Sequence, residues 1–105
     1  MRKREPYLKA TYNITAEDFE SMLEAQGGVC AICEQEDPRF REDGTRYPLS
    51  VDHDHASSQV RLLLCGACNA GLGLFQDDPE LLLRAAEYLR LHTPKSALVK
   101  STLRT

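Results

Sequence analysis

The stretch VDHDHASSQVRLLLCGACN, residues 51–69, decides the fold of this protein. It holds two of the three histidines of the chain beside two aspartates, and it ends in a CxxC pair that Asn69 follows directly. The other two of the four cysteines form an earlier CxxC pair in VCAIC, at Cys30 and Cys33. The pattern can therefore serve one metal site or two.

Length and composition indicate one small globular domain. Hydrophobic residues make up 42% of the 105 residues and charged residues 28%, values that are typical of a folded chain. The two ends are polar and basic, so we expect a tail over residues 1–10, a domain over residues 11–92 and a second tail over residues 93–105. A net charge of -3 argues against a tight, sequence-indifferent nucleic-acid binder, which usually has a basic surface.

The sequence shows no targeting or membrane segment. No run approaches the roughly 20 apolar residues that span a bilayer, and the basic start MRKREPYLKA has no apolar segment behind it. We therefore expect a cytoplasmic protein with no membrane partner. Reducing conditions there keep thiols free, so the two CxxC pairs indicate metal thiolates and not the disulfides of a small secreted protein.

The two CxxC pairs can bring four thiolates to one tetrahedral ion, because each short knuckle presents two sulfurs. Four soft ligands leave no open position, so the predicted site is structural zinc held by Cys30, Cys33, Cys65 and Cys68. A redox CxxC of the thioredoxin type needs a βαβ context that this sequence lacks, whereas an iron–sulfur centre fits the sulfur count alone. Neither alternative explains the histidines.

Local patterns predict a helix and a hairpin around these motifs. A helix is expected in YNITAEDFESMLEAQGG, from a cap at Thr15 to the final glycine pair, with a core face formed by Phe19, Met22 and Leu23. Residues 34–48 lack periodicity and are predicted to form a surface loop. Two β-prone runs, 49–55 and 60–65, predict a hairpin, and GACNAGLGLF predicts a knuckle that enters a short helix.

A last helix is expected from a cap at Asp78 and a first residue Pro79 to Leu91. His92, at the end of this helix, lies outside the other motifs. Its expected role is structural, as a favourable charge near the helix C-terminus. Apolar residues at helical spacing predict that the helix has a buried stripe, formed by Leu81, Leu82, Ala85, Tyr88 and Leu89.

A closed zinc site leaves five polar side chains without a role: Asp52, His53, Asp54, His55 and Asn69. Carboxylate and amide oxygens are ligands that suit Mg²⁺, and a neutral imidazole near such a metal can take a proton from water. The plainer interpretation is that these residues decorate an exposed hairpin and that the asparagine caps the following helix. Together, in this spacing, they favour a functional site.

The chain resembles the phage recombination endonuclease VII group of HNH nucleases in VDHDH, VRLLLC, CGACN, GLGLFQDDPELL, YNIT and GGVCAIC. The resemblance implies an α+β fold, a small zinc-stapled ββα-metal domain (the HNH or His-Me finger) with flanking helices. It implies structural zinc at the four cysteines and a catalytic divalent cation, Mg²⁺ or another, on Asp52 and Asn69. It makes His53 the general base, and His55 a contact of the scissile phosphate or a support of the site.

The function that the resemblance implies is metal-dependent hydrolysis of DNA phosphodiester bonds, by nicking, double-strand cleavage or cleavage of branched DNA. It implies a protein encoded by a phage in a bacterial host, or by a bacterium, and leaves monomer and homodimer open. The alternative is a non-catalytic zinc-stabilised module that binds nucleic acid or protein. Such a module needs the cysteines but has no need of Asp52, His53 and Asn69.

The spacing of the candidate residues makes geometric demands on the hairpin. Adjacent residues of a regular strand point to opposite faces, so Asp52 and His53 can share a site only if the strand is irregular there. We predict such an irregularity at Asp52, with His53 and His55 on one face. Where the family usually has glycine, this chain has Ser58 and Leu62, so we expect a loop longer than a two-residue turn. The candidate phosphate contacts are Arg39, Arg41 and Arg61.

Overall fold

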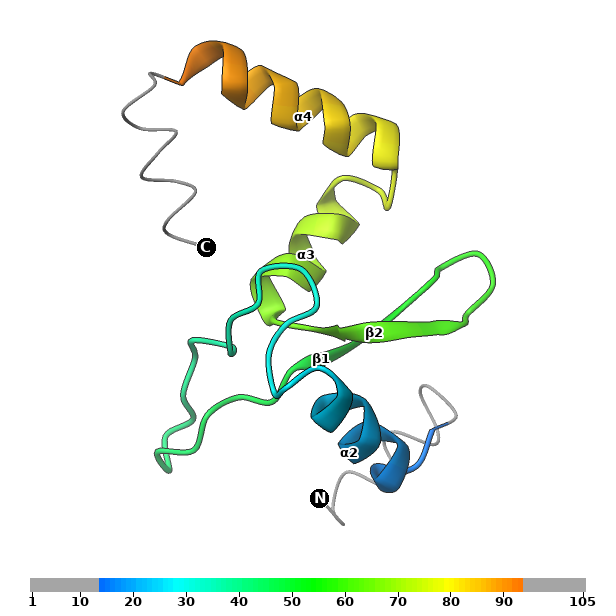
Figure 1. The fold of residues 1–105 in the computed structure, drawn as a ribbon, viewed down its shortest axis with the longest axis vertical. Helices are drawn as coiled ribbons and strands as arrows, with labels where there is room; N and C mark the ends of the chain where they lie inside the picture. The colour runs from blue at the N-terminus through cyan, green and yellow to red at the C-terminus, as the bar shows by residue number, and fades with distance from the viewer. Residues whose placement is uncertain (1–13, 94–105) are drawn as a thin grey trace. The chain divides into compact units, whose positions relative to one another are not determined.

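The computed structural model describes residues 14–93, which fall into two compact units that meet in the sequence between Asn69 and Ala70. The elements, in chain order, are α2 (Ala16–Ala25), β1 (Ser50–His53), β2 (Val60–Leu64), α3 (Gly66–Leu74) and α4 (Pro79–His92). Within the described residues, three helices and a two-stranded antiparallel sheet make the α+β fold that the sequence predicts (Figure 1). The predicted tails lie outside the described residues, apart from Thr93, and the domain bounds at residues 11 and 92 stay a prediction.

The helix α2 begins and ends at the residues that its sequence predicts. The Thr15 hydroxyl accepts a hydrogen bond from the Asp18 N–H at 3.0 Å, and the Asp18 carboxylate accepts one from the Thr15 N–H at 2.9 Å. These two bonds complete a capping box. At the other end Gly27 and Gly28 have φ of 67° and 79°, the left-handed region that ends a helix at little cost for glycine.

The sheet contains the predicted irregularity. Val51 pairs with Leu63, but two residues later His53 pairs with Val60, so the register shifts by one residue between these pairs. Two residues of β2 therefore oppose Asp52 alone, which is the arrangement of a β-bulge. The bulge lies opposite Asp52, where the sequence predicts an irregularity, and its extra residue belongs to β2.

The loop between the strands spans residues 54–59 and is longer than a two-residue turn, as predicted. The Asp54 carboxylate accepts hydrogen bonds from the N–H groups of Ser57 and Ala56 at 3.0 and 2.8 Å, which hold its pKa below the usual value. Asp54 therefore builds the loop. Ser58 has φ of 63°, a left-handed conformation that glycine adopts more easily.

The core of the first unit forms where α2 meets the hairpin. Leu63 is fully buried, and the other apolar residues of this core are Phe19, Leu49, Val51 and Leu64. The Gln26 side chain joins α2 to β2, because its amide both donates to the Leu63 carbonyl and accepts from the Leu63 N–H, each at 2.9 Å. The core prediction for α2 is confirmed for Phe19, whereas Met22 and Leu23 are half-buried.

The second unit corrects one prediction. Asp78 caps α4 as expected, since its carboxylate accepts hydrogen bonds from the N–H groups of Glu80 and Leu81 at 3.0 and 3.3 Å. The predicted buried stripe is wrong: no residue of α4 is buried, and Tyr88 and Leu89 are 63% and 58% exposed. The part of this unit that the structure describes contains the end of α3 and the 14-residue α4, which together offer too little surface to bury an apolar face.

No described helix, from α2 to α4, combines the length and the apolar character that crossing a membrane requires.

Candidate functional site

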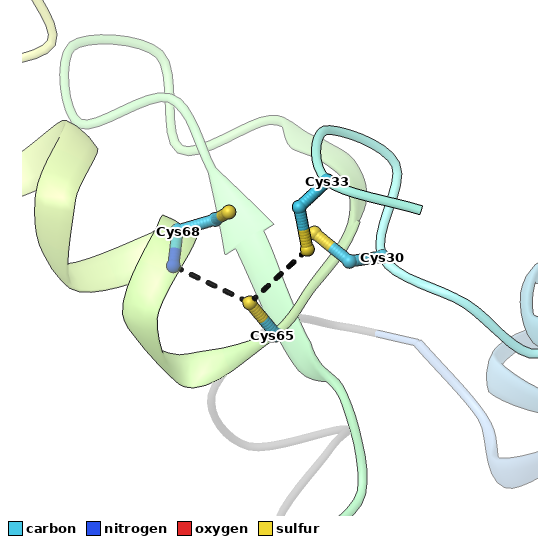
Figure 2. A group of neighbouring side chains, drawn as sticks. All are labelled: Cys30, Cys33, Cys65 and Cys68. Carbon is cyan, nitrogen blue, oxygen red and sulfur yellow. Dashed lines mark hydrogen bonds between the residues drawn. The ribbon is translucent and has the colours of Figure 1, made fainter. Parts of the chain in front are cut away.

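Four cysteines from two separate segments of the first unit converge on one point. Figure 2 shows their sulfur atoms turned toward one another, and all four Sγ atoms lie within 4.8 Å of each other. Within residues 14–93 no other group of three or more Cys, His, Asp or Glu side chains comes close enough to hold a metal ion. All four are free thiols, so the disulfide alternative finds no support. The predicted ligand set is therefore arranged to bind a metal ion, and the members of this cysteine cluster are Cys30, Cys33, Cys65 and Cys68.

Backbone N–H groups already point at the sulfurs of this cluster. The Ile32 N–H donates to Cys30 Sγ and the Cys68 N–H to Cys65 Sγ, each at 3.4 Å (Figure 2 draws the second bond). Burial raises the pKa of Cys30, but backbone N–H groups around its sulfur outweigh burial and bring the pKa to about 7. Burial and the neighbouring thiols raise the pKa of Cys68. Four thiolates this close together therefore require a cation, which is what a bound metal supplies.

A buried carboxylate that sequence reasoning missed connects this cluster to the loop over residues 34–48. Asp37 is only 1% exposed. Its Oδ2 accepts hydrogen bonds from the Gly66 N–H at 2.9 Å and from Arg39 Nη2 at 2.8 Å, while Oδ1 accepts from Arg39 Nε at 2.9 Å and the Arg39 N–H at 3.0 Å. The hydrogen bonds from the Arg39 side chain outweigh the effect of burial and hold the pKa of Asp37 far below its usual range.

This carboxylate positions the helix that carries two of the candidate residues. Gly66 is the first residue of α3, and its N–H is one of the donors that a helix leaves without an intrahelical partner. Asp37 accepts from that N–H and puts negative charge at the N-terminus of α3, one turn before Cys68 and Asn69. A Cβ at position 66 would meet Arg39 Nη2 at 2.4 Å, so glycine keeps the approach open.

All three arginines of the loop over residues 34–48 lie against aromatic rings. The Arg39 guanidinium lies 4.5 Å from the centre of the Tyr47 ring and that of Arg41 lies 5.3 Å from it, while Arg46 lies 4.4 Å from the centre of Phe40. Phe40 and Arg46 also form an isolated antiparallel bridge. The predicted surface loop is therefore exposed but locally ordered.

Asp52 lies at the bulge and is paired with an arginine of the opposite strand. Asp52 as a whole is 8% exposed. Its carboxylate accepts two hydrogen bonds, from Arg61 Nε at 2.5 Å and from Arg61 Nη2 at 3.1 Å. This two-pronged pairing is the strong geometry for a guanidinium on a carboxylate. Arg61, a predicted phosphate contact, is thus paired with Asp52, a predicted metal ligand.

The two histidines lie together, as the sequence predicts. The ring centres of His53 and His55 are 4.9 Å apart and the rings stand at 86° to each other, so the two side chains share a face of the hairpin. His53 is half-buried and His55 is exposed. Asn69 lies in the first turn of α3, where its N–H donates to the Cys65 carbonyl at 3.0 Å, so the cysteine cluster holds its backbone in place.

Comparison with known proteins agrees with these features. A family model described as recombination endonuclease VII matches residues 5–91. The chain belongs to the recombination endonuclease VII family. This match confirms the resemblance seen in the sequence and places the chain in a family of nucleases.

Two similar proteins come from mycobacterial phages. The Gene 59 protein of Mycobacterium phage D29 is 48% identical over 87 residues, and that of Mycobacterium phage L5 is 44% identical over 86 residues. The matched parts cover 82% and 81% of this chain but 49% of each relative. This member of the endonuclease VII family therefore spans about half the length of the curated relatives it matches.

Proposed function

We propose that this protein is a metal-dependent DNA endonuclease of the HNH type, with Asp52, His53 and Asn69 as its catalytic residues. The observation that carries the proposal is the membership of a nuclease family in a chain whose irregular hairpin contains Asp52 and His53. The extra residue of the bulge lies in β2 opposite Asp52, and the ring centre of His53 lies 4.9 Å from that of His55. A module that only binds nucleic acid would not need this arrangement.

In this proposal the cysteine cluster holds structural zinc. Four sulfur ligands suit zinc and leave no position for a reactive water, so the ion contributes to folding and takes no part in hydrolysis. The cluster supports the catalytic residues because Cys65 follows β2 and Cys68 precedes Asn69 in the same turn of α3.

The donor set for a catalytic cation is the Asp52 carboxylate and the Asn69 amide oxygen. Both are hard oxygen ligands of the kind that Mg²⁺ prefers. The Asp52 carboxylate is a nearly buried acidic oxygen donor, and Arg61, which pairs with it, would give way to a bound cation. A divalent cation bound there would stabilise the negative charge that grows on the phosphate and on the leaving oxygen.

His53 acts as the general base in this scheme. Its neutral imidazole takes a proton from a water molecule, and the water oxygen attacks phosphorus in line with the departing 3′ oxygen. The bond from phosphorus to the 3′ oxygen breaks and that oxygen takes up a proton from solvent, which leaves a 5′ phosphate and a 3′ hydroxyl. His55, with its ring 4.9 Å from that of His53, contacts the phosphate or orients His53.

A plasmid nicking assay tests the proposal. Zinc-loaded wild type should nick supercoiled DNA with Mg²⁺ and not without it, whereas His53→Ala should be inactive with unchanged zinc content and helicity. The matched control is His92→Ala, at the end of α4, which should remain active. Cleavage retained in His53→Ala would defeat the general-base role.

The same protein should be tested on plain duplex, nicked, cohesive-end and four-way-junction DNA, which identifies the form of DNA that is cut. No cleavage of any form by the zinc-loaded protein would favour the non-catalytic binding module. Light scattering on the active sample distinguishes monomer from homodimer.

A further inference from the structure

The carboxylate proposed to bind the catalytic cation is already neutralised by the protein itself. Arg61 donates from Nε to Asp52 Oδ2 at 2.5 Å and from Nη2 to Oδ1 at 3.1 Å, so both oxygens are engaged. The bulge creates this pairing, because it leaves Asp52 facing the segment of β2 that contains Arg61. The Asp52 side chain is 10% exposed and that of Arg61 is 37% exposed, so solvent reaches the arginine more easily.

A divalent cation and this guanidinium compete for the same oxygens. A metal such as Mg²⁺ binds a carboxylate oxygen at about 2.1 Å, which leaves no room for an N–H donor along the same direction. Two positive groups on one nearly buried carboxylate also repel each other strongly, because little water screens them. Metal binding at Asp52 must therefore displace at least part of Arg61.

We propose that a divalent cation exchanges with Arg61 on the Asp52 carboxylate and that the displaced guanidinium binds a phosphate of the DNA. This inference rests on the proposed function. A released guanidinium close to the cation would lie next to the phosphate that the cation holds, and its planar donors suit phosphate oxygens.

The exchange makes metal and DNA bind cooperatively. The metal frees Arg61 for the phosphate, and a phosphate that binds Arg61 frees Asp52 for the metal, so each ligand raises the affinity of the other by the same factor. The pair also neutralises a carboxylate whose side chain is only 10% exposed. Arg61 thus controls cation binding indirectly, as a positioning residue that pairs with Asp52, and it binds the phosphate directly.

Metal binding without DNA tests the first half of the exchange. The dissociation constant for Mn²⁺ is measured by electron paramagnetic resonance on zinc-loaded protein in chelator-free buffer. Arg61→Gln should bind Mn²⁺ on the order of tenfold tighter than wild type, because a competing charge-assisted hydrogen bond is gone. Arg61→Lys keeps the charge without the two-pronged geometry and should fall between them.

Two control variants separate the possible failures. Arg41→Gln removes one positive charge from the same unit without touching Asp52, and it should leave Mn²⁺ affinity unchanged. Asp52→Asn should abolish the Mn²⁺ site. If Asp52→Asn binds Mn²⁺ like wild type, the proposed metal ligand and the exchange both fail. If only Asp52→Asn weakens binding and Arg61→Gln equals wild type, the exchange fails and the proposed function stands.

DNA binding tests the second half. Fluorescence anisotropy with Ca²⁺, used as a divalent cation that does not support cleavage, should show tighter DNA binding by wild type than in divalent-free buffer. Arg61→Gln should lose most of that gain. With Ca²⁺, the slope of its log affinity against log salt concentration should be smaller in magnitude than that of wild type by about 1, which corresponds to one lost phosphate contact. An equal gain from Ca²⁺ in both proteins would overturn the release of Arg61 to phosphate.

Discussion

Replacing Asp37 by asparagine tests whether a buried carboxylate, beyond the four cysteines, holds the start of α3. The wild-type carboxylate accepts three N–H groups of Arg39 and one of Gly66. Asparagine has a single side-chain oxygen. Its NH₂ group replaces the other carboxylate oxygen and faces the N–H donors that bonded to that oxygen. Whichever way the amide turns, one backbone N–H, of Arg39 or of Gly66, then faces a donor and loses its acceptor.

The structure sets the size of the effect. The Arg39 side chain is 54% exposed, so water can replace its lost hydrogen bonds and they add little. A backbone donor left unsatisfied inside the fold costs about 1–3 kcal/mol, so we expect the free energy of unfolding to fall by about 2 kcal/mol. For a domain of this size that is a drop in melting temperature of roughly 10 °C.

Urea unfolding of the zinc-loaded protein, followed by circular dichroism at pH 7, measures this difference. The control is Asp43→Asn, which alters an exposed carboxylate that accepts from the Thr45 N–H at 2.9 Å and hydroxyl at 2.6 Å, and it should change stability far less. Chelator should also remove zinc faster from Asp37→Asn. Equal urea midpoints for the two variants would refute the role assigned to Asp37.

The pH dependence of this difference has a definite sign. The native pKa of Asp37 lies far below the value of about 3.9 expected in the unfolded chain, so the carboxylate stabilises the fold fully above that value. Its contribution disappears only as the pH falls through the native pKa. The gap between wild type and Asp37→Asn should therefore be constant from pH 6 to pH 8, and a gap that closes in this window would contradict the assignment.

Three further changes should act on separate parts of the molecule. Cys65→Ser should lose zinc and unfold, since it opens the structural site, and a fully helical variant by circular dichroism would show that zinc is not required. Zinc retention against a competing chelator should weaken as the pH falls, because protons compete with the metal for the thiolate sulfurs, and a flat profile would argue against thiolate ligands. Ser58→Gly should raise stability by about 1 kcal/mol in urea, because φ of 63° strains serine and not glycine, and a loss would show that the Ser58 side chain stabilises the loop.

The sequence by itself determined the elements and the cysteine ligands. The capping box of Thr15 and Asp18, the glycine pair after α2 and the spacing of the CxxC motifs act over a few neighbouring residues, so their outcome can be derived before the chain folds. An irregularity at Asp52 was also predicted, because strand alternation conflicts with a site shared by adjacent residues, but the extra residue of the bulge lies in β2. The catalytic roles of Asp52, His53, His55 and Asn69 stay a proposal.

Only the tertiary structure decided which polar groups are buried and with whom they pair. Asp37 lies in a polar stretch that resembles any surface loop, and its partner Gly66 is 29 residues away along the chain. The contact of Arg61 with Asp52 depends on the register shift, and the exposure of α4 depends on which surfaces fold against it. Hydrogen-bond caps and motif spacings are local, whereas burial and ion pairing depend on groups that only the folded chain brings together.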